Sequence, residues 1–243
     1  DHRDLHKEYR RQGQMCIRDS VKGKVLYSDQ VNALKTPTAI VDVPQAVSIM
    51  TDEDIRKQGI REIGDIVRYT PGVNTSQGEG HRDAVVFRGV RSTADFFQDG
   101  ARDDVQYYRS LYNVEQVEVL RGPNALLFGR GGTGGIINRV TKKATIGETF
   151  GSFDLGADDF GSTDLAIDYN TSAGENSAIR LNAHVDALEN HRDFYDGDRT
   201  GFNPTMRIEL SDNTTCLLYT SDAPDDTPSE DLGARRIIKK KSG

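Results

Sequence analysis

The stretch of sequence that decides the fold, VEVLRGPNALLFGRGGTGGIINRV, occupies residues 117–140. It opens with a short run typical of a strand, which ends at the Arg-Gly-Pro of residues 121–123. Five of the seven residues at positions 129–135 are glycine. Glycine at this density indicates backbone with positive φ, or backbone that lies against another surface. β-Branched residues resume at Ile136, so we expect a second strand over residues 136–140.

Short elements of both kinds precede this stretch. Residues 38–49, TAIVDVPQAVSI, predict a strand on each side of Pro44. Thr51, with Asp54 three residues later, is close to a capping box and predicts a helix that breaks at Gly59. Together with the region that follows, these elements predict one compact α+β domain.

The rest of this domain is predicted from the spacing of its apolar residues. Isoleucine and valine recur at helical spacing in residues 63–67, and a Pro-Gly pair at residues 71–72 stops this second helix. Three further segments lead to the glycine-rich stretch: strands over residues 84–89 and 96–99, a charged surface loop over residues 101–110, and a helix followed by a strand over residues 112–120.

The pattern changes to strict alternation after residue 145. In residues 179–186 Ile, Leu, Ala and Val alternate with Arg, Asn, His and Asp, and residues 153–157, 165–169 and 202–211 alternate in the same way. Such segments are typical of outer-membrane strands. A soluble antiparallel sheet with one wet face fits the alternation equally well. The short turn at residues 172–176 and the long charged loop at residues 189–201 favour a barrel.

Several segments occur in an order and spacing that resemble the plug domain of TonB-dependent outer-membrane receptors. They read VPQAVSI, IVRYTPGV, FRG, QDG, NVEQVEVLRGP and LLFGRGGTGGIINRVTK, and they cover residues 38–143. The segment NALLFGRGGTGG is most similar to the ferric-siderophore branch of the family. One departure is Phe87, where the family often has isoleucine.

The resemblance implies a fold class and an order of domains. It implies a lead-in segment (residues 21–37), an α+β plug domain (residues 38–145) and the first strands of an antiparallel transmembrane β-barrel (residues 146–215). The barrel is incomplete in this chain, because a plugged transporter barrel needs about 22 strands.

The resemblance also implies a function. It implies a receptor of the outer membrane of a Gram-negative bacterium that binds and imports a ferric siderophore, with the plug facing the periplasm and the barrel lumen. Its partners are the ferric siderophore, the TonB energy-transducing complex and outer-membrane lipid, and it is neither an enzyme nor a holder of cofactors. Import of another large cargo such as cobalamin is an alternative. Nucleic acid is not expected as a partner, because 38 acidic residues outnumber 31 basic ones.

A soluble dinucleotide-binding oxidoreductase is the alternative of another class. Gly129, Gly131 and Gly134 satisfy the G-x-G-x-x-G pattern, which requires a helix that begins at the glycines. The residues that follow are β-branched and predict a strand, so the pattern disfavours this function.

Ten residues form the structural motif that the resemblance implies. Arg88 and Arg121 each follow a predicted strand and precede glycine, and in the family such arginines are thought to meet glutamates of the barrel wall; a solvated surface role is the alternative. We expect the glycines to let the plug pack closely on that wall. The set is Arg88, Gly89, Arg121, Gly122, Pro123, Gly129, Gly131, Gly132, Gly134 and Gly135.

Two polar loops are the candidate ligand-binding loops at the apex of the plug. One holds Gln77, His81 and Arg82, and the other holds Arg102, Gln106, Tyr107 and Tyr108. Arginine and tyrosine can bind an anionic aromatic chelate through charge and stacking, although ordinary solvated loops would have the same composition. No metal-ligand spacing and no catalytic triad stands out, so we expect the siderophore to supply the ligands of iron.

The two ends of the chain are predicted to be translated sequencing adapter. MCIRD at residues 15–19 fits the codons ATG TGT ATA AGA GAC, which resemble the transposase end of a library adapter, and CLLYTSDAPDD at residues 216–226 fits the reverse complement with one departure. We therefore expect residues 1–20 and 216–243 to add nothing to fold or function. Both cysteines, Cys16 and Cys216, lie in these ends and say nothing about redox compartment.

Overall fold

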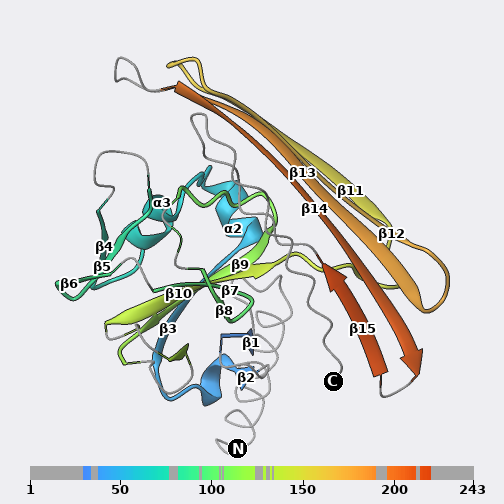
Figure 1. Ribbon diagram of the computed structural model, residues 1–243, viewed down its shortest axis with the longest axis horizontal. Helices are drawn as coiled ribbons and strands as arrows, with labels where there is room; N and C mark the ends of the chain where they lie inside the picture. Colours follow the sequence, from blue (N-terminus) through green and yellow to red (C-terminus); the bar gives the residue numbers. More distant parts are fainter. Residues whose placement is uncertain are drawn as a thin grey trace, which may run out of the picture.

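The computed structural model describes residues 30–33, 38–76, 82–92, 95–103, 105, 107–123, 128–129, 132, 134–189, 196–211 and 214–219. These residues form two parts, which Figure 1 shows side by side. The N-terminal domain reaches to residue 145 and mixes short helices with strands. The C-terminal sheet is long, curved and antiparallel.

A five-stranded mixed sheet lies at the centre of the N-terminal domain. Its order is β3-β9-β10-β7-β8, and only the β10–β7 pair is parallel. The strands are β3 (Ala46–Thr51), β9 (Val114–Arg121), β10 (Gly135–Thr141), β7 (Phe96–Gln98) and β8 (Ala101–Arg102). The two strands that flank the glycine-rich stretch are therefore confirmed as the neighbours β9 and β10.

The first helix begins as the sequence predicts. In α2 (Asp52–Lys57) the Thr51 hydroxyl accepts the Asp54 N–H at 3.3 Å, and the Asp54 carboxylate accepts the Thr51 N–H at 3.3 Å. This reciprocal pair is the capping box, and it satisfies backbone donors that the helix leaves open. The helix ends before Gly59, whose φ is +61°.

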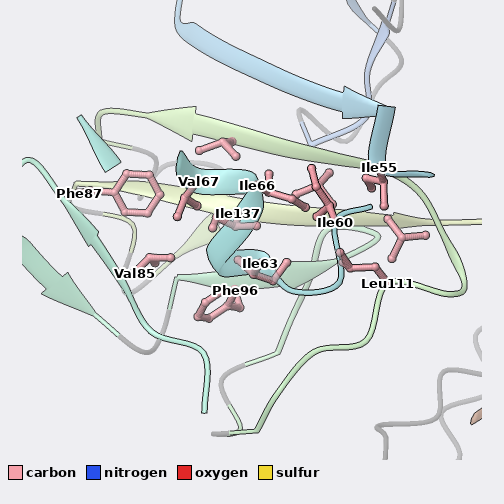
Figure 2. Packing of buried hydrophobic residues seen from close by; sticks show 13 residues of the cluster. Ile55, Ile60, Ile63, Ile66, Val67, Val85, Phe87, Phe96, Leu111 and Ile137 are labelled. Atoms are coloured by element: carbon pink, nitrogen blue, oxygen red, sulfur yellow. The ribbon is translucent and has the colours of Figure 1, made fainter. Parts of the chain in front are cut away.

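The second helix carries the core of the domain. Helix α3 (Ile63–Arg68) directs Ile63, Ile66 and Val67 onto the central sheet, where they meet Phe96 and Ile137 (Figure 2). All three helix residues are at most 1% exposed. Burial of each such side chain stabilises the fold by about 1.5–3 kcal/mol, so this face fixes the predicted helix on the sheet.

A smaller sheet, β4-β5-β6, extends the domain on one side. Its strands are β4 (Val73–Thr75), β5 (Val85–Phe87) and β6 (Val90–Ser92). Arg88 and Gly89 connect β5 to β6, with φ angles of +48° and +88°. Two positive φ angles in a two-residue connection define a tight hairpin turn whose twist matches the strands.

Three local predictions in the domain are wrong. Before Pro44 the chain forms only a two-residue strand, β2 (Thr38–Ala39), which pairs with β1 (Gln30–Val31). The 3₁₀ turn η1 (Ile40–Asp42) follows. A longer strand does not form because the chain must turn into β3 and proline has no N–H to donate to a neighbouring strand. Residues 112–113 form a turn rather than a helix, because β9 follows at once. Residues 107–110, expected in a surface loop, are buried.

The C-terminal sheet confirms the alternating strands. Its order is β11-β12-β13-β14-β15, and every neighbouring pair is antiparallel. The strands are β11 (Phe150–Ala157), β12 (Thr163–Ser172), β13 (Ser177–Glu189), β14 (Asp196–Ser211) and β15 (Thr214–Tyr219). Strands β13 and β14 have 13 and 16 residues, more than the roughly 9–11 that cross a bilayer.

The two faces of this sheet are reversed relative to a soluble protein. On β13, Ile179 and Val185 are 41% and 58% exposed, whereas Arg180, Asn182 and His184 are at most 7% exposed. The polar face is covered by the N-terminal domain, and the apolar face is open. A soluble sheet would bury its apolar face, so the structure decides between the two interpretations of the alternation in favour of barrel strands.

Strand β15 crosses the predicted boundary at residue 215. Residues 216–219 continue this strand and pair with β14. The physical reason is that β14 offers unpaired backbone groups that an adjoining extended segment can satisfy. Residues 1–20 and 220–243 lie outside the described residues, and their origin as adapter stays a prediction. Within the described chain, no helix has the length and apolar character needed to cross a membrane.

Candidate functional site between the domain and the sheet

The N-terminal domain meets the C-terminal sheet through charged side chains. Arg61, just after the Gly59 turn, lies 2.8 Å from Asp164 and 3.6 Å from Asp158 of the sheet. Arg56 of α2 donates to the Ser152 hydroxyl at 3.4 Å. These pairs are partly exposed, and such pairs contribute about 0–1 kcal/mol each. This edge of the interface is therefore weakly held.

Deeper in the interface, the ion pairs are buried. The Lys142 ammonium lies 3.3 Å from Asp52 of the domain and 3.2 Å from Asp168 of the sheet. Asp168 also accepts two parallel hydrogen bonds from Arg180, both at 2.8 Å. Arg180 in turn reaches Glu115 of the domain at 3.3 Å, although the Glu115 side chain is 52% exposed. Lys142 of the domain and Asp168 of the sheet thus neutralise each other in the buried part of the interface.

An aromatic contact lies beside these charges. The Tyr112 ring of the domain stacks on the His184 ring of β13, with centroids 4.7 Å apart and planes 7° from parallel. The same ring also meets Gly201 of β14, the register partner of His184, where an added Cβ would lie 2.6 Å from the tyrosine ring. Glycine in a strand interior often marks such a close approach.

A cavity of about 290 Å³ lies between the two parts. That volume is at the lower limit for pockets that hold drug-sized ligands. Both acidic and basic side chains line the cavity. The cavity therefore suits water or small ions better than a bulky chelate. Its charged lining comprises Asp52, Arg56, Arg61, Lys142, Asp154, Asp164, Asp168, Asp186 and Arg199.

The structure separates the predicted ligand-binding residues. Tyr107 and Tyr108 are only 6% and 9% exposed, so they belong to the interior of the domain rather than to an open loop. The Tyr107 hydroxyl donates to Asp103 at 2.7 Å. Arg82 is half-buried, and Arg102 is half-buried with its guanidinium donating to the Phe128 carbonyl at 3.1 Å. The three remaining candidates lie outside the described residues: Gln77, His81 and Gln106.

The burial of the tyrosines has a cause that sequence analysis missed. Arg109 is 1% exposed, and its guanidinium lies between the rings of Phe96 and Tyr107, at 3.9 and 4.5 Å from their centroids. It also donates to Asp103 at 3.0 Å, and Arg139 donates to the same carboxylate at 2.6 Å. The only signal in the sequence is the mixture of Asp, Arg and Tyr in residues 101–110, which fits a buried network as well as a loop.

Asp83 completes this network from another strand end. Its carboxylate accepts the Arg109 backbone N–H at 2.7 Å and is 4% exposed. Burial raises the pKa of Asp83 to about 6, against the opposing effects of the Arg109 hydrogen bond and charge. The network therefore holds residues 83, 103, 107, 109 and 139 together in the interior of the domain.

The arginines of the predicted structural motif play different roles. Arg88 is exposed at the tip of the β5–β6 turn, where its side chain can reach another element. Arg121 instead donates to the Pro71 carbonyl at 3.2 Å and the Ser48 hydroxyl at 3.1 Å, next to Gly122 (φ +113°) and Pro123. These bonds tie Arg121 to the domain, and a contact with wall glutamates outside this chain stays a prediction.

Two glycines of the predicted motif pack against the domain itself. An added Cβ at Gly134 or Gly135 would lie 2.6 Å from Phe87 of β5. Gly129 and Gly132 have φ angles of +74° and +68°, and Gly131 lies outside the described residues. Close packing of these glycines on barrel strands outside this chain stays a prediction.

Neither a nucleotide site nor a metal site is present in the described part of the chain. A strand, β10, begins at Gly135 where a dinucleotide site requires a helix, so the oxidoreductase alternative is contradicted. The described residues also contain no group of three or more His, Cys, Asp or Glu side chains that could hold a metal ion.

Comparison with known proteins gives a consistent result. Residues 39–136 match the TonB-dependent Receptor Plug Domain. The chain is 33% identical over 189 residues to the probable TonB-dependent receptor BfrD of Bordetella pertussis, covering 76% of this chain and 25% of the relative. It is 28% identical over 221 residues to the catecholate siderophore receptor Fiu of Escherichia coli K12, covering 84% and 28%. The chain thus spans about a quarter of the length of these relatives.

Solved structures agree on the fold. The siderophore receptor PiuA from Acinetobacter baumannii is similar with a TM-score of 0.72 and 27% identity, over 80% of this chain and 28% of that chain. The ferric-catecholate import receptor Fiu is similar with a TM-score of 0.71 over 80% of this chain and 29% of that chain; at 24% identity this similarity concerns the fold alone.

Proposed function

Because this chain belongs to the TonB-dependent receptors, we propose that it is part of an outer-membrane receptor that binds and imports a ferric siderophore. The observation that carries the proposal is the reversed C-terminal sheet, with Ile179 and Val185 exposed and Arg180 and His184 buried under the domain. This arrangement suits lipid on the outer face and a plug in the lumen. The names of the relatives support a siderophore as the cargo, since they include catecholate and ferrioxamine B receptors.

The interface suits a plug that must move. A hydrophobic contact would hold the domain on the sheet permanently, whereas ion pairs can exchange their partners for water. Arg56 and Arg61 pair with the sheet at a partly exposed edge, and such pairs are weak. The buried pairs at Lys142 and Arg180 make the resting position specific. In our proposal the TonB complex acts from the periplasm and shifts this balance.

The ligand is assigned to the outer loops of the plug and of the remaining barrel. Arg82 and Arg102 are the described candidates, because each carries a charge that could attract an anionic chelate. Tyr107 and Tyr108 no longer belong to this set, since both are buried. Gln77, His81 and Gln106 stay predictions.

The proposal can be tested with the full-length receptor in an outer membrane. Cells with and without TonB would receive a radioactive ferric catecholate, a ferric hydroxamate or cobalamin. We expect binding of one ferric siderophore in both strains and uptake in the TonB-containing strain alone. Uptake that is equal in the two strains would contradict TonB-dependent import, and uptake of cobalamin alone would replace the siderophore as cargo.

A further inference from the structure

Glu118 is a carboxylate in the middle of the hydrophobic interior. It lies on β9, the second strand of the five-stranded sheet, between Ile49 of β3 and Asn138 of β10, and is 0% exposed. The ion pairs formed by the described residues include none with Glu118. A buried charge without a cation is costly unless hydrogen bonds satisfy it. The hydrogen-bond donors around Glu118 therefore indicate its role.

Two of these donors are backbone N–H groups from a distant part of the chain. The Asn32 N–H donates to Oε1 at 2.6 Å, and the Ala33 N–H donates to Oε2 at 2.7 Å. The side chains of Gln116 and Asn138 supply the other two hydrogen bonds, at 2.6 and 3.0 Å. Each oxygen thus accepts one backbone and one side-chain donor. Hydrogen bonds to an ionised acceptor are roughly twice as strong as neutral ones.

Among the described residues, the same segment has few other polar contacts. Strand β1 pairs with β2 through only two residue pairs, Gln30 with Ala39 and Val31 with Thr38. Val31 and Ala33 are 0% exposed and pack in a small cluster with Phe97, Leu120, Phe128 and Ile136. The two apolar side chains flank the clasped amides, so withdrawing the segment opens the space above Glu118 to water.

We propose that Glu118 is a latch that positions the N-terminal segment on the domain. With the segment in place, the carboxylate accepts four hydrogen bonds and is 0% exposed. When residues 30–33 leave, the carboxylate loses both backbone donors and becomes hydrated through the space that Val31 and Ala33 vacate. Docking of the segment and desolvation of Glu118 are therefore one event. This inference rests on the proposed function, and it attaches the N-terminal segment to a buried strand of the sheet, β9, so that a force on the segment would act on Glu118.

The latch can be tested by hydrogen exchange in the full-length receptor purified in detergent. The variant is Glu118→Gln, which keeps the shape but replaces one oxygen with an NH₂ group. However the amide is turned, this NH₂ group faces the N–H of either Asn32 or Ala33. Gln116→Met is the matched control, because it also removes one hydrogen bond to Glu118 but leaves both backbone donors in place.

We expect exchange in the peptide covering residues 30–33 to be at least tenfold faster in Glu118→Gln than in wild type, with a smaller change in Gln116→Met. Exchange of the Ile137 amide, which is bonded to the Asp95 carbonyl in the sheet, should be unchanged in both variants. Equal exchange of residues 30–33 in the two variants would overturn the latch.

A second measurement keeps the proposal open to test if Glu118→Gln fails to fold. In the wild-type receptor the Asn32 and Ala33 amides should exchange as slowly as amides of β9, and fast exchange there would overturn the proposal. Both measurements are made without TonB and without ligand. Failure of the latch is therefore distinguishable from failure of siderophore import, which the uptake assay reports.

Discussion

Tyr112 of the plug and Gly201 of the barrel wall are a matched pair. An added Cβ at Gly201 would lie 2.6 Å from the tyrosine ring, and the ring stacks on His184 on the same wall. Contacts this close are essentially absent in real proteins, so a side chain at position 201 would collide with the Tyr112 ring. Glycine at this position therefore allows the plug to dock on the wall.

We predict that Gly201→Val weakens docking of the plug and that Tyr112→Ala restores part of it. The single wall substitution forces the ring away from His184, at a cost of about 1–3 kcal/mol for overpacking. The measurement is a double-mutant cycle on urea unfolding of the plug in the full-length receptor. Additive effects of the two substitutions would show that the ring and the wall do not meet. Gly197→Val serves as the control, because an added Cβ there meets nothing within 4 Å.

A second prediction concerns the lipid face. Val185 is 58% exposed on the apolar face of β13. Val185→Arg should reduce assembly of the receptor, because a charge at the bilayer midplane costs about 2–4 kcal/mol. The folded fraction can be measured by heat-dependent mobility in gels of outer membranes.

The control for this prediction is Thr215→Arg on the polar face of β15, where the register partner Glu209 can pair with the new charge. His184→Arg and Ser152→Arg would be poor controls, since His184 stacks on Tyr112 and Ser152 accepts a hydrogen bond from Arg56. Equal loss of assembly for Val185→Arg and Thr215→Arg would count against lipid on the apolar face.

A third prediction follows from the pKa of Asp83, which burial raises to about 6. The unfolded chain releases this proton near pH 4, whereas the folded domain keeps it until about pH 6. Between these values the folded state binds more protons, so the free energy of unfolding falls as the pH rises and then levels off. The full effect is about 3 kcal/mol, from roughly 1.4 kcal/mol for each pH unit.

Asp83→Asn should remove this dependence while its amide oxygen still accepts the Arg109 N–H. The measurement is urea unfolding at pH 4.5 and pH 7, compared as the difference between wild type and variant, so that other carboxylates cancel. Asp65→Asn is the control, because Asp65 forms only a partly exposed pair with Arg68. A wild-type receptor that gains as much stability from pH 4.5 to 7 as Asp83→Asn would contradict the raised pKa.

Local patterns in the sequence were sufficient for the elements that depend on neighbouring residues. The capping box at Thr51 and the strands around the glycine-rich stretch are of this kind, since each is set by residues a few positions apart. The alternation of β13 also gave the two faces correctly. The alternation could not show which of the two faces is buried, because that depends on where the plug lies.

The candidate site was less predictable because its contacts span long distances in the sequence. Arg109 takes its buried position from Asp83, 26 residues earlier, and Asp103 is shared with Arg139, 36 residues later. Without these partners, residues 101–110 have the composition of a solvated loop. The role of Gly134 was missed for the same reason, since its neighbour Phe87 belongs to a separate sheet.

The last prediction concerns the ligand. With Tyr107 and Tyr108 buried, simultaneous replacement of Arg102 and both tyrosines by alanine would disturb the fold, because Tyr107 bonds to Asp103 and Arg139. The better test uses the two half-buried arginines. Arg82→Ala and Arg102→Ala should each weaken binding of an anionic ferric siderophore by roughly tenfold, the loss of a charged hydrogen bond of about 1.5 kcal/mol.

Binding of the radioactive chelate to purified full-length receptor measures the effect, with Arg82→Lys and Arg102→Lys showing how much charge alone retains. Tyr107→Phe is the control for indirect damage. It should lower the free energy of unfolding by about 1–2 kcal/mol, through loss of two buried hydrogen bonds, and leave affinity unchanged. If neither alanine variant alters affinity, the described plug residues do not contact the chelate, and the binding groups must lie in the loops of the remaining barrel. Weakened binding in Tyr107→Phe as well would mean that the arginine variants act through the fold.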